Sequence, residues 1–144
     1  MRIRKAYGGA CFYELKKEGC RMKLGDVAKI LDACVICGKD MLDFEVDSAF
    51  GADLMSDVLA FVKPTTLVLT GMMNPHVIRT AEMLDVHCIV CVRGKQPTQE
   101  MLDEAEKIGV ALLSTEKTLY TCCGLLYAAG LRGCERKEVH DGSV

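Results

Sequence analysis

The chain has 144 residues, of which half are hydrophobic and 26% are charged, and its formal net charge is −2. This length and composition suit one globular domain with its own core, and the slightly acidic balance argues against a nucleic-acid-binding protein. No apolar run of about 18 residues and no apolar signal segment are present, so we expect neither a membrane span nor export, and therefore a cytoplasmic protein.

The first part of the chain divides into an extension and the start of a domain. Residues 1–21 carry six Lys or Arg against two Glu and a Gly-Gly break, so we expect a partly disordered extension with one short helix near residues 12–18. From Met22 onward, apolar residues at helical spacing predict a helix across residues 24–31. The further elements predicted in this half are strands at 34–37 and 44–50 and a helix at 54–62 that Pro64 ends.

The second part of the chain is more regular. Its predicted strands are 66–69, 88–92 and 110–113, all continuous apolar runs typical of strands buried on both faces. A helix follows each strand: Asn74 and Pro75 begin the first, Thr98 caps the second, which Gly109 ends, and Thr118 caps the third. We expect the domain to span residues 22–131 and the polar tail, residues 132–144, to fray.

The alternation of strand and helix predicts the fold class. Three consecutive strand–helix units at this spacing imply right-handed βαβ crossovers, and hence an α/β fold around a mainly parallel sheet. In such sheets ligands bind beyond the carboxyl ends of the strands.

The predicted strand ends carry residues suited to an anionic ligand. Hydroxyls, glycines and two cations stand there just before helix N-termini, which favour anions. The same residues would also serve as helix caps and turn formers around solvated cations, and the edge would equally serve as a dimer contact. The candidate ligand-binding residues are Thr70, Gly71, Asn74, Arg93, Gly94, Lys95, Ser114, Thr115 and Thr118.

A catalytic arrangement is not recognisable in the sequence. The P-loop, dinucleotide-binding and nucleophile-elbow patterns are all absent. His76 falls in the first turn of a helix, His87 is next to Cys88 but on the opposite face of a strand, and His140 lies in the polar tail. We therefore predict a non-enzymatic protein with no catalytic residues.

Nine cysteines are many for this length. An odd number does not suit a complete set of disulfides, and we expect reduced thiols. Cys34 and Cys37 have the spacing of a zinc knuckle, as have Cys88 and Cys91, but a closed zinc site needs four ligands and residues three apart in a strand face opposite ways. We therefore interpret the cysteines as small buried apolar residues and predict no metal and no cofactor, although the sequence leaves open whether Cys34 and Cys37 bind zinc.

Residues 22–131 resemble the DRTGG domain family. The segments that carry the resemblance are MKLGDVAKILDACVICG, DFEVDSAFGADLMSDVLAFV, TLVLTGMMNPHVIRTAEMLDVHCIVCVRGK and PTQEMLDEAEKIGVALLSTEKTLYTCCGLLYAAGL. The last segment is also similar to the end of the N-terminal, non-catalytic domain of HPr kinase/phosphorylase. The letters D-R-T-G-G do not occur as a run, and no P-loop accompanies the resemblance, so kinase activity is not implied.

The resemblance implies an HPr kinase N-terminal-domain-like fold, a homodimer and a regulatory role. Relatives are fused to CBS pairs or to phosphotransacetylase, and stand-alone relatives are encoded beside iron-hydrogenase components. We therefore expect a ligand-sensing domain that binds a small anionic metabolite or a nucleotide. The alternative is a protein-interaction or assembly module for an iron-hydrogenase-type redox enzyme.

Overall fold

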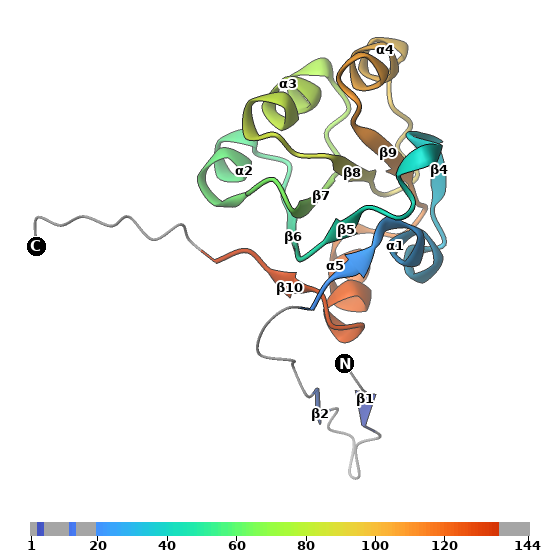
Figure 1. The fold of residues 1–144 in the computed structure, drawn as a ribbon, viewed down its shortest axis with the longest axis vertical. Coiled ribbons are helices and arrows are strands. Elements are labelled where there is room, and N and C mark those ends of the chain that lie inside the picture. The colour runs from blue at the N-terminus through green and yellow to red at the C-terminus, as the bar shows by residue number, and fades with distance from the viewer. Residues whose placement is uncertain (1–2, 5–11, 14–19, 136–144) are drawn as a thin grey trace, which may run out of the picture.

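The computed structural model describes residues 3–4, 12–13 and 20–135 (Figure 1). In chain order its elements are β1 (Ile3–Arg4), β2 (Phe12–Tyr13), β3 (Met22–Lys23), α1 (Leu24–Leu31), β4 (Cys34–Cys37), the 3-10 turn η1 (Lys39–Met41), β5 (Glu45–Val46), β6 (Ser48–Gly51), α2 (Met55–Phe61), β7 (Thr66–Thr70), α3 (Pro75–Leu84), β8 (Cys88–Cys91), α4 (Gln99–Ile108), β9 (Ala111–Ser114), α5 (Leu119–Ala128) and β10 (Arg132–Gly133).

A six-stranded sheet organises the domain. Its strand order is β10-β6-β7-β8-β9-β4. Every neighbouring pair is parallel except β4 and β9, which are antiparallel. The consecutive units β6-α2-β7, β7-α3-β8 and β8-α4-β9 are βαβ crossovers, so the predicted α/β fold with a mainly parallel sheet is confirmed.

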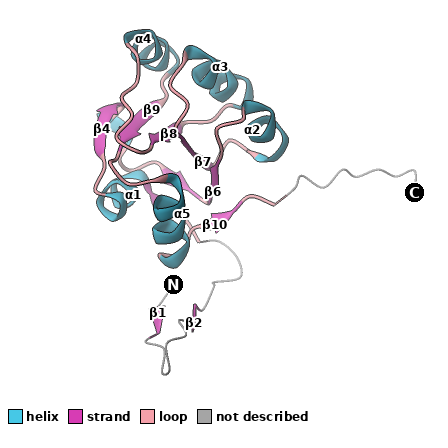
Figure 2. Cartoon of the chain, turned by 180° about the vertical axis from the view of Figure 1, so that it is seen from behind, coloured by secondary structure: helices cyan, strands magenta, loops and turns pink. Residues whose placement is uncertain are grey.

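Helices cover both faces of this sheet. Helices α2, α3 and α4 lie on one face, and α1 and α5 lie on the other (Figures 1 and 2). Strand residues alternate between the two cores: Leu67 and Leu69 pack on the α1/α5 side, whereas Val68 packs on the α2–α4 side. The five residues of β7 and the four of β8 are all buried, as expected for strands covered on both faces. Among the described residues, none of the helices is long and apolar enough to span a bilayer.

Helix boundaries largely follow the predicted cap residues. The Asn74 side chain accepts a hydrogen bond from the His76 amide at 2.9 Å, and the Thr98 hydroxyl accepts one from the Met101 amide at 3.2 Å. Gly109 ends α4 in the left-handed conformation with φ of 80°. Thr118 precedes α5 as predicted, but its hydroxyl donates to the Thr121 hydroxyl at 3.2 Å instead of capping a backbone amide.

Three parts of the chain differ from the sequence-based expectations. The strand predicted at 44–50 is divided: β5 pairs with β3 in a small antiparallel sheet, and β6 joins the main sheet. The division falls at Asp47, whose amide bonds to Thr65 O at 3.0 Å and whose carboxylate accepts from the Ser48 hydroxyl at 2.8 Å. These hydrogen bonds at Asp47 interrupt the strand, so that residues 44–50 do not form one continuous element.

The two ends of the chain also differ. In the helix predicted at 12–18, residues 12–13 form strand β2 paired with β1, so the prediction is wrong there, and residues 14–18 lie outside the described residues. The first two residues of the predicted tail, Arg132 and Gly133, form β10 and pair with β6. Residues 136–144 lie outside the described part of the chain.

The edge strand β4 depends on a glycine at its end. Gly38 has φ of 82°, and a Cβ built on it would lie 2.7 Å from the Ala111 Cβ at the start of β9. A side chain at position 38 would therefore strain the backbone and push β4 away from β9. Gly109 has a similar φ of 80°, but a Cβ built there meets no atom within 4 Å.

We expect Gly38→Ala to lower the free energy of unfolding by more than Gly109→Ala does. The left-handed backbone costs a non-glycine residue about 1–2 kcal/mol at either position, and only Gly38→Ala adds an overlap with Ala111. Urea unfolding of both variants measures the difference. Equal losses of stability would show that β4 moves without cost and that the contact between Gly38 and Ala111 is unimportant.

Candidate functional site

The loops that follow β7, β8 and β9 meet at one edge of the sheet. Thr70 pairs with Cys91, and Cys91 pairs with Ser114, so the ends of these three parallel strands lie in one row. Backbone hydrogen bonds tie the loops together, because Val92 N donates to Thr70 O at 3.1 Å and Gly94 N donates to Thr115 O at 2.9 Å. We call these loops, with the loop after β6, the carboxyl rim: residues 52–53, 70–74, 92–98 and 114–118.

Arg93 is the most unusual residue of the carboxyl rim. It has φ of 60°, one of three positive values among the non-glycine residues described. A Cβ built on Gly71 would lie 2.5 Å from Arg93 Nη2 and 3.1 Å from Arg93 Nε. The guanidinium of Arg93 therefore lies against the backbone at the end of β7, where Gly71 has no side chain. Arg93 as a whole residue is exposed.

Asp53 is a rim residue that the sequence analysis missed. Its Oδ1 accepts hydrogen bonds from the Gly71 amide at 2.7 Å and from the Thr70 hydroxyl at 3.1 Å. The carboxylate thus holds the turn that leaves β7. The sequence contains a signal for this role, because Asp53 comes just after a strand that ends at Gly51. The predicted site residues likewise come just after the other parallel strands. Asp53 was overlooked because β6 was not recognised as a member of the parallel sheet.

The buried hydroxyls of the rim serve the fold. Thr115 donates from its hydroxyl to Leu31 O at 2.7 Å and so ties the rim to the end of α1. The Ser114 hydroxyl donates to Lys95 O at 3.1 Å and accepts from Gln96 Nε2 at 3.3 Å. Thr70 accepts from the Met72 amide at 3.1 Å in addition to its bond with Asp53. These three hydroxyls position the loops around them.

The other predicted site residues lie at the rim in different environments. Asn74 and Thr118 are exposed at the starts of α3 and α5, and Lys95 is exposed beside Arg93. A Cβ built on Gly94 would lie 2.5 Å from Glu116 Oε2, so the carboxylate of Glu116 packs over this glycine. All nine predicted residues are therefore at one edge, and the exposed charged groups there include the cations Arg93 and Lys95 and the carboxylate of Glu116.

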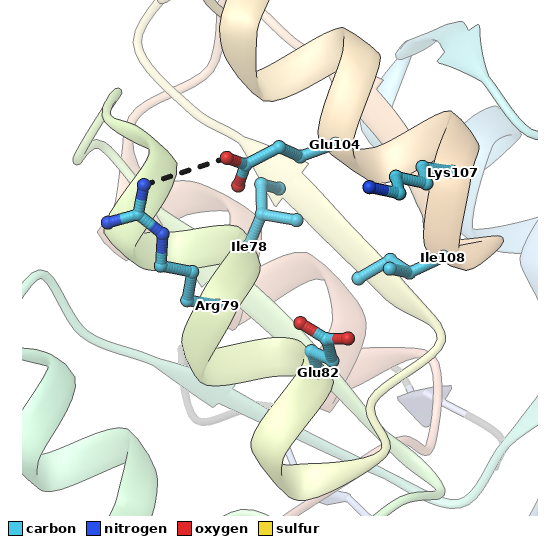
Figure 3. Close-up of a pocket in the computed structure, with 6 residues that line it drawn as sticks. All are labelled: Ile78, Arg79, Glu82, Glu104, Lys107 and Ile108. Atoms are coloured by element: carbon cyan, nitrogen blue, oxygen red, sulfur yellow. Dashed lines mark ion pairs between the residues drawn. The ribbon is translucent and has the colours of Figure 1, made fainter.

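A hollow of about 310 Å³ lies away from the carboxyl rim, between α3 and α4 (Figure 3). Arg79 Nη2 is 3.6 Å from Glu104 Oε1 across it. The lining pairs two carboxylates with two cations, so it offers a small anion no excess positive charge. Its residues are Ile78, Arg79, Glu82, Glu104, Lys107 and Ile108.

The described histidines have ordinary surroundings. The ring of His87 is 4.8 Å from the ring of Phe44, which places it beside the α1/α5 core and away from the rim. His76 is exposed in the first turn of α3. His140 lies outside the described residues.

Comparisons with known proteins place the chain in a family. A family model described as the DRTGG domain matches residues 26–129, well over half of the chain. The chain belongs to the DRTGG domain family.

None of the curated proteins matches the sequence. A solved structure of the CBS and DRTGG domains in the regulatory region of Clostridium perfringens pyrophosphatase, complexed with the activator diadenosine tetraphosphate, has a TM-score of 0.62 and 14% identity. The match covers 81% of this chain and about half, 51%, of that chain, and at this identity it shows the fold.

Most cysteines of this DRTGG domain are structural. Cys88 and Cys91 are fully buried, and burial raises the pKa of each thiol to about 12. Burial likewise raises the pKa of Cys122 to about 11. Cys34 is exposed, whereas Cys37 is buried and its thiol donates to Val110 O at 3.5 Å. Within the described residues, three or more Cys, His, Asp or Glu side chains do not gather in an arrangement that would hold a metal ion.

Above pH 9 we expect the folded protein to lose stability as unfolding frees these thiols to ionise. The pKa of Cys88 and Cys91 rises from 9.0 to about 12 on burial. Between these values the unfolded chain binds fewer protons than the folded one, so the free energy of unfolding falls as pH rises through 9. The fall is at most about 1.4 kcal/mol per thiol per pH unit. Urea unfolding at about pH 8 and about pH 10 measures it.

Two variants separate the buried thiols from general alkaline effects. Cys91→Ala should reduce the loss of stability between the two pH values, because it removes one buried ionisable group. Cys34→Ser is the matched control, since Cys34 is exposed, and it should leave the loss unchanged. An identical pH dependence in the wild type and in Cys91→Ala would contradict the explanation.

Proposed function

We propose that this DRTGG domain is a non-catalytic regulatory domain that binds a small anionic ligand, a nucleotide above all, at the carboxyl rim. The observation that carries the proposal is the Arg93 side chain. It lies against Gly71 from a left-handed backbone position and keeps an exposed surface at the junction of three loops. Arginine is well suited to bind phosphate, because its planar group offers several donors in a fixed geometry.

The backbone of Arg93 supports a ligand-binding role. A non-glycine residue in the left-handed region costs about 1–2 kcal/mol, and such strain gathers at functional sites. The turn itself is held by main-chain bonds, since Arg93 N donates to Lys117 O at 2.8 Å and Lys95 N donates to Val92 O at 3.1 Å. Glycine at position 93 would make the same bonds without the strain. The turn itself therefore does not explain why position 93 is an arginine. Binding of an anion by the Arg93 side chain would explain it.

The rim carries two cations that favour an anion, Arg93 and Lys95, and beside them the carboxylate of Glu116, which lies over Gly94. Lys95 is exposed next to Arg93 and adds a second cation. The Asp53 carboxylate is occupied by the Gly71 amide and the Thr70 hydroxyl, so it shapes the turn beneath Arg93. The helices α3, α4 and α5 all begin just after the rim loops, and their N-termini add favourable dipoles.

The structural neighbour suggests which anions to test first. The regulatory region of the pyrophosphatase is complexed with diadenosine tetraphosphate, an activator with a polyphosphate chain. A nucleotide of this class would place phosphates against Arg93 and Lys95. A regulatory domain that responds to such a ligand requires no catalytic residues, which fits the absence of recognisable catalytic motifs from the sequence.

Two predictions from the sequence go with this proposal. A homodimer and a small anionic ligand both suit a regulatory domain, and the homodimer stays a prediction. The alternative role, as an assembly module for an iron-hydrogenase-type redox enzyme, stays a prediction.

Binding of diadenosine tetraphosphate, ATP, acetyl phosphate and citrate, each titrated by isothermal calorimetry, tests the proposal. We expect at least one phosphate compound to bind and Arg93→Gly to weaken it by about 10- to 100-fold, the loss expected when a charge-assisted hydrogen bond of about 1.5–3 kcal/mol is removed. Since Arg93→Gly also relieves the left-handed backbone, its thermal stability should equal or exceed that of the wild type.

Matched lysine variants control for net charge. Lys95→Ala at the rim should weaken binding, whereas Lys63→Ala should not, because Lys63 stands just before β7 at the opposite edge and pairs with Asp47 at 3.4 Å. No heat of binding for any compound in the panel, or equal affinity in the wild type and Arg93→Gly, would refute the site.

A further inference from the structure

Glu116 is a charged residue of the carboxyl rim to which the proposed ligand site gives no role. The residue is exposed, and its carboxylate lies on the turn formed by Arg93 and Gly94. A Cβ built on Gly94 would lie 2.5 Å from Glu116 Oε2 and 3.3 Å from Glu116 Oε1. The carboxylate therefore lies against the residue that separates Arg93 from Lys95, the two cations assigned to an anionic ligand.

Main-chain hydrogen bonds fix the loop from which Glu116 reaches this turn. Gly94 N donates to Thr115 O at 2.9 Å, and Arg93 N donates to Lys117 O at 2.8 Å. The residues before and after Glu116 are thus both bonded to the turn. Gly94 has φ of 67° and no side chain, so it leaves open the space in which the carboxylate lies. The fold therefore presents a negative group at the place where the proposed ligand would put its own negative charge.

A matching contact of opposite charge joins the neighbouring loops. Arg93 is the second residue after β8, and its guanidinium lies over Gly71. Glu116 is the second residue after β9, and its carboxylate lies over Gly94 in the same way. Each side chain covers a glycine of the preceding loop. The contact between Glu116 and Gly94 is therefore a property of how successive strand–loop units pack.

The Glu116 carboxylate is held less firmly than that of Asp53. Asp53 Oδ1 accepts from the Gly71 amide at 2.7 Å and from the Thr70 hydroxyl at 3.1 Å. None of the hydrogen bonds and ion pairs found among the described residues involves the side chain of Glu116. Rotation of this exposed side chain away from Gly94 therefore breaks no polar contact.

We propose that Glu116 is an internal competitor of the anionic ligand. Its carboxylate occupies the turn of Arg93 and Gly94 in the unliganded domain and leaves when a phosphate group binds there. This inference rests on the proposed function, because it concerns the same site. The apparent affinity of the rim is then its intrinsic affinity multiplied by the fraction of molecules in which Glu116 has left the turn.

The competition makes the rim selective for polyphosphates. Displacement of Glu116 lowers the affinity of every anion by the same factor. A ligand with several phosphate groups contacts both Arg93 and Lys95 and still binds after this loss, whereas a small anion that makes one such contact gains too little. Glu116 thus favours nucleotides over small inorganic anions.

Coordination of a metal ion is the other role that a carboxylate beside a phosphate can have. The charges around Glu116 disfavour this role. Lys117 follows Glu116 directly, and Arg93 and Lys95 flank the glycine that the carboxylate covers. A divalent cation at this place would meet three positive charges and one negative charge. Removal of the Glu116 charge distinguishes the two roles, because it strengthens binding under competition and weakens binding under coordination.

Calorimetric titration of the full chain with diadenosine tetraphosphate, ATP, acetyl phosphate and citrate, each without and with Mg²⁺, tests the competition. Glu116→Gln removes the charge at nearly constant size and should raise the affinity about two- to fivefold, the range that exposed charges give. The gain should be similar without and with Mg²⁺, and it should shrink when NaCl is raised from about 0.05 M to about 0.2 M. Glu82→Gln is the matched control: Glu82 is exposed on α3, away from the rim, so this variant should bind like the wild type.

The results separate the role of Glu116 from the ligand site itself. Equal affinity in the wild type and Glu116→Gln, with weaker binding by Arg93→Gly, would leave the ligand site in place and overturn the competition. Weaker binding by Glu116→Gln in the presence of Mg²⁺ would also overturn it and would assign the carboxylate to a metal ion. Absence of binding in the wild type and in Glu116→Gln alike would remove the ligand site and the competition together. Binding by Glu116→Gln alone would support both.

Discussion

The register of β6, β7, β8 and β9 is the constraint on which the rest of the structure depends. These strands run parallel, and β7 and β8 are buried on both faces. A shift of one residue in the register of any of these strands would turn each of its side chains to the opposite face of the sheet. Side chains that now pack in one core would then point into the other. The same register aligns Thr70, Cys91 and Ser114, so the packing of the sheet interior also decides which loops meet at the carboxyl rim.

The rim combines a backbone held by hydrogen bonds with two long, exposed side chains, Arg93 and Lys95. Its buried hydroxyls and the Asp53 carboxylate are all engaged with neighbouring loops, so the positions of the turns are well determined. Arg93 and Lys95 stand on these turns with long, exposed side chains. A ligand site of this kind needs little rearrangement of the backbone, because binding orders two side chains on loops already held by main-chain hydrogen bonds.

The two sides of α5 meet different demands. The inner side, with Cys122 and Leu126, belongs to the core beside α1. The outer side keeps tyrosines and a glycine where a solvated helix would carry charges. Helix α5 begins at Leu119, directly after the rim residue Thr118. Leu119 and Cys123 also pack closely over Gly51, so α5 rests directly on the end of β6.

The local elements could be predicted from the sequence because short-range chemistry decides them. Continuous apolar runs predicted β7, β8 and β9. Asn74, Pro75, Thr98 and Gly109 predicted the ends of α3 and α4, because a cap acts on its own turn. The three rim loops followed from the rule that parallel strands end at one edge. Elements without such a run or cap were predicted less well: residues 44–50 divide into β5 and β6 at Asp47, and residues 12–13 form a strand instead of the start of a helix.

Only the tertiary structure decided the contacts between distant segments. Asp53, just after β6, bonds to Thr70 and Gly71 at the end of the neighbouring strand β7. Arg93 lies over Gly71 from the next loop, and nothing local to Asp53 or Arg93 indicates these partners. The antiparallel pairing of β4 with β9, and the pairing of Arg132 and Gly133 with β6, likewise join segments that are far apart in the sequence. The sequence by itself determined which segments form strands and helices and which residues end them, since those choices depend on neighbours along the chain. The folded structure determined which ends meet and which helix face stays uncovered, since those depend on how the two cores close around the sheet.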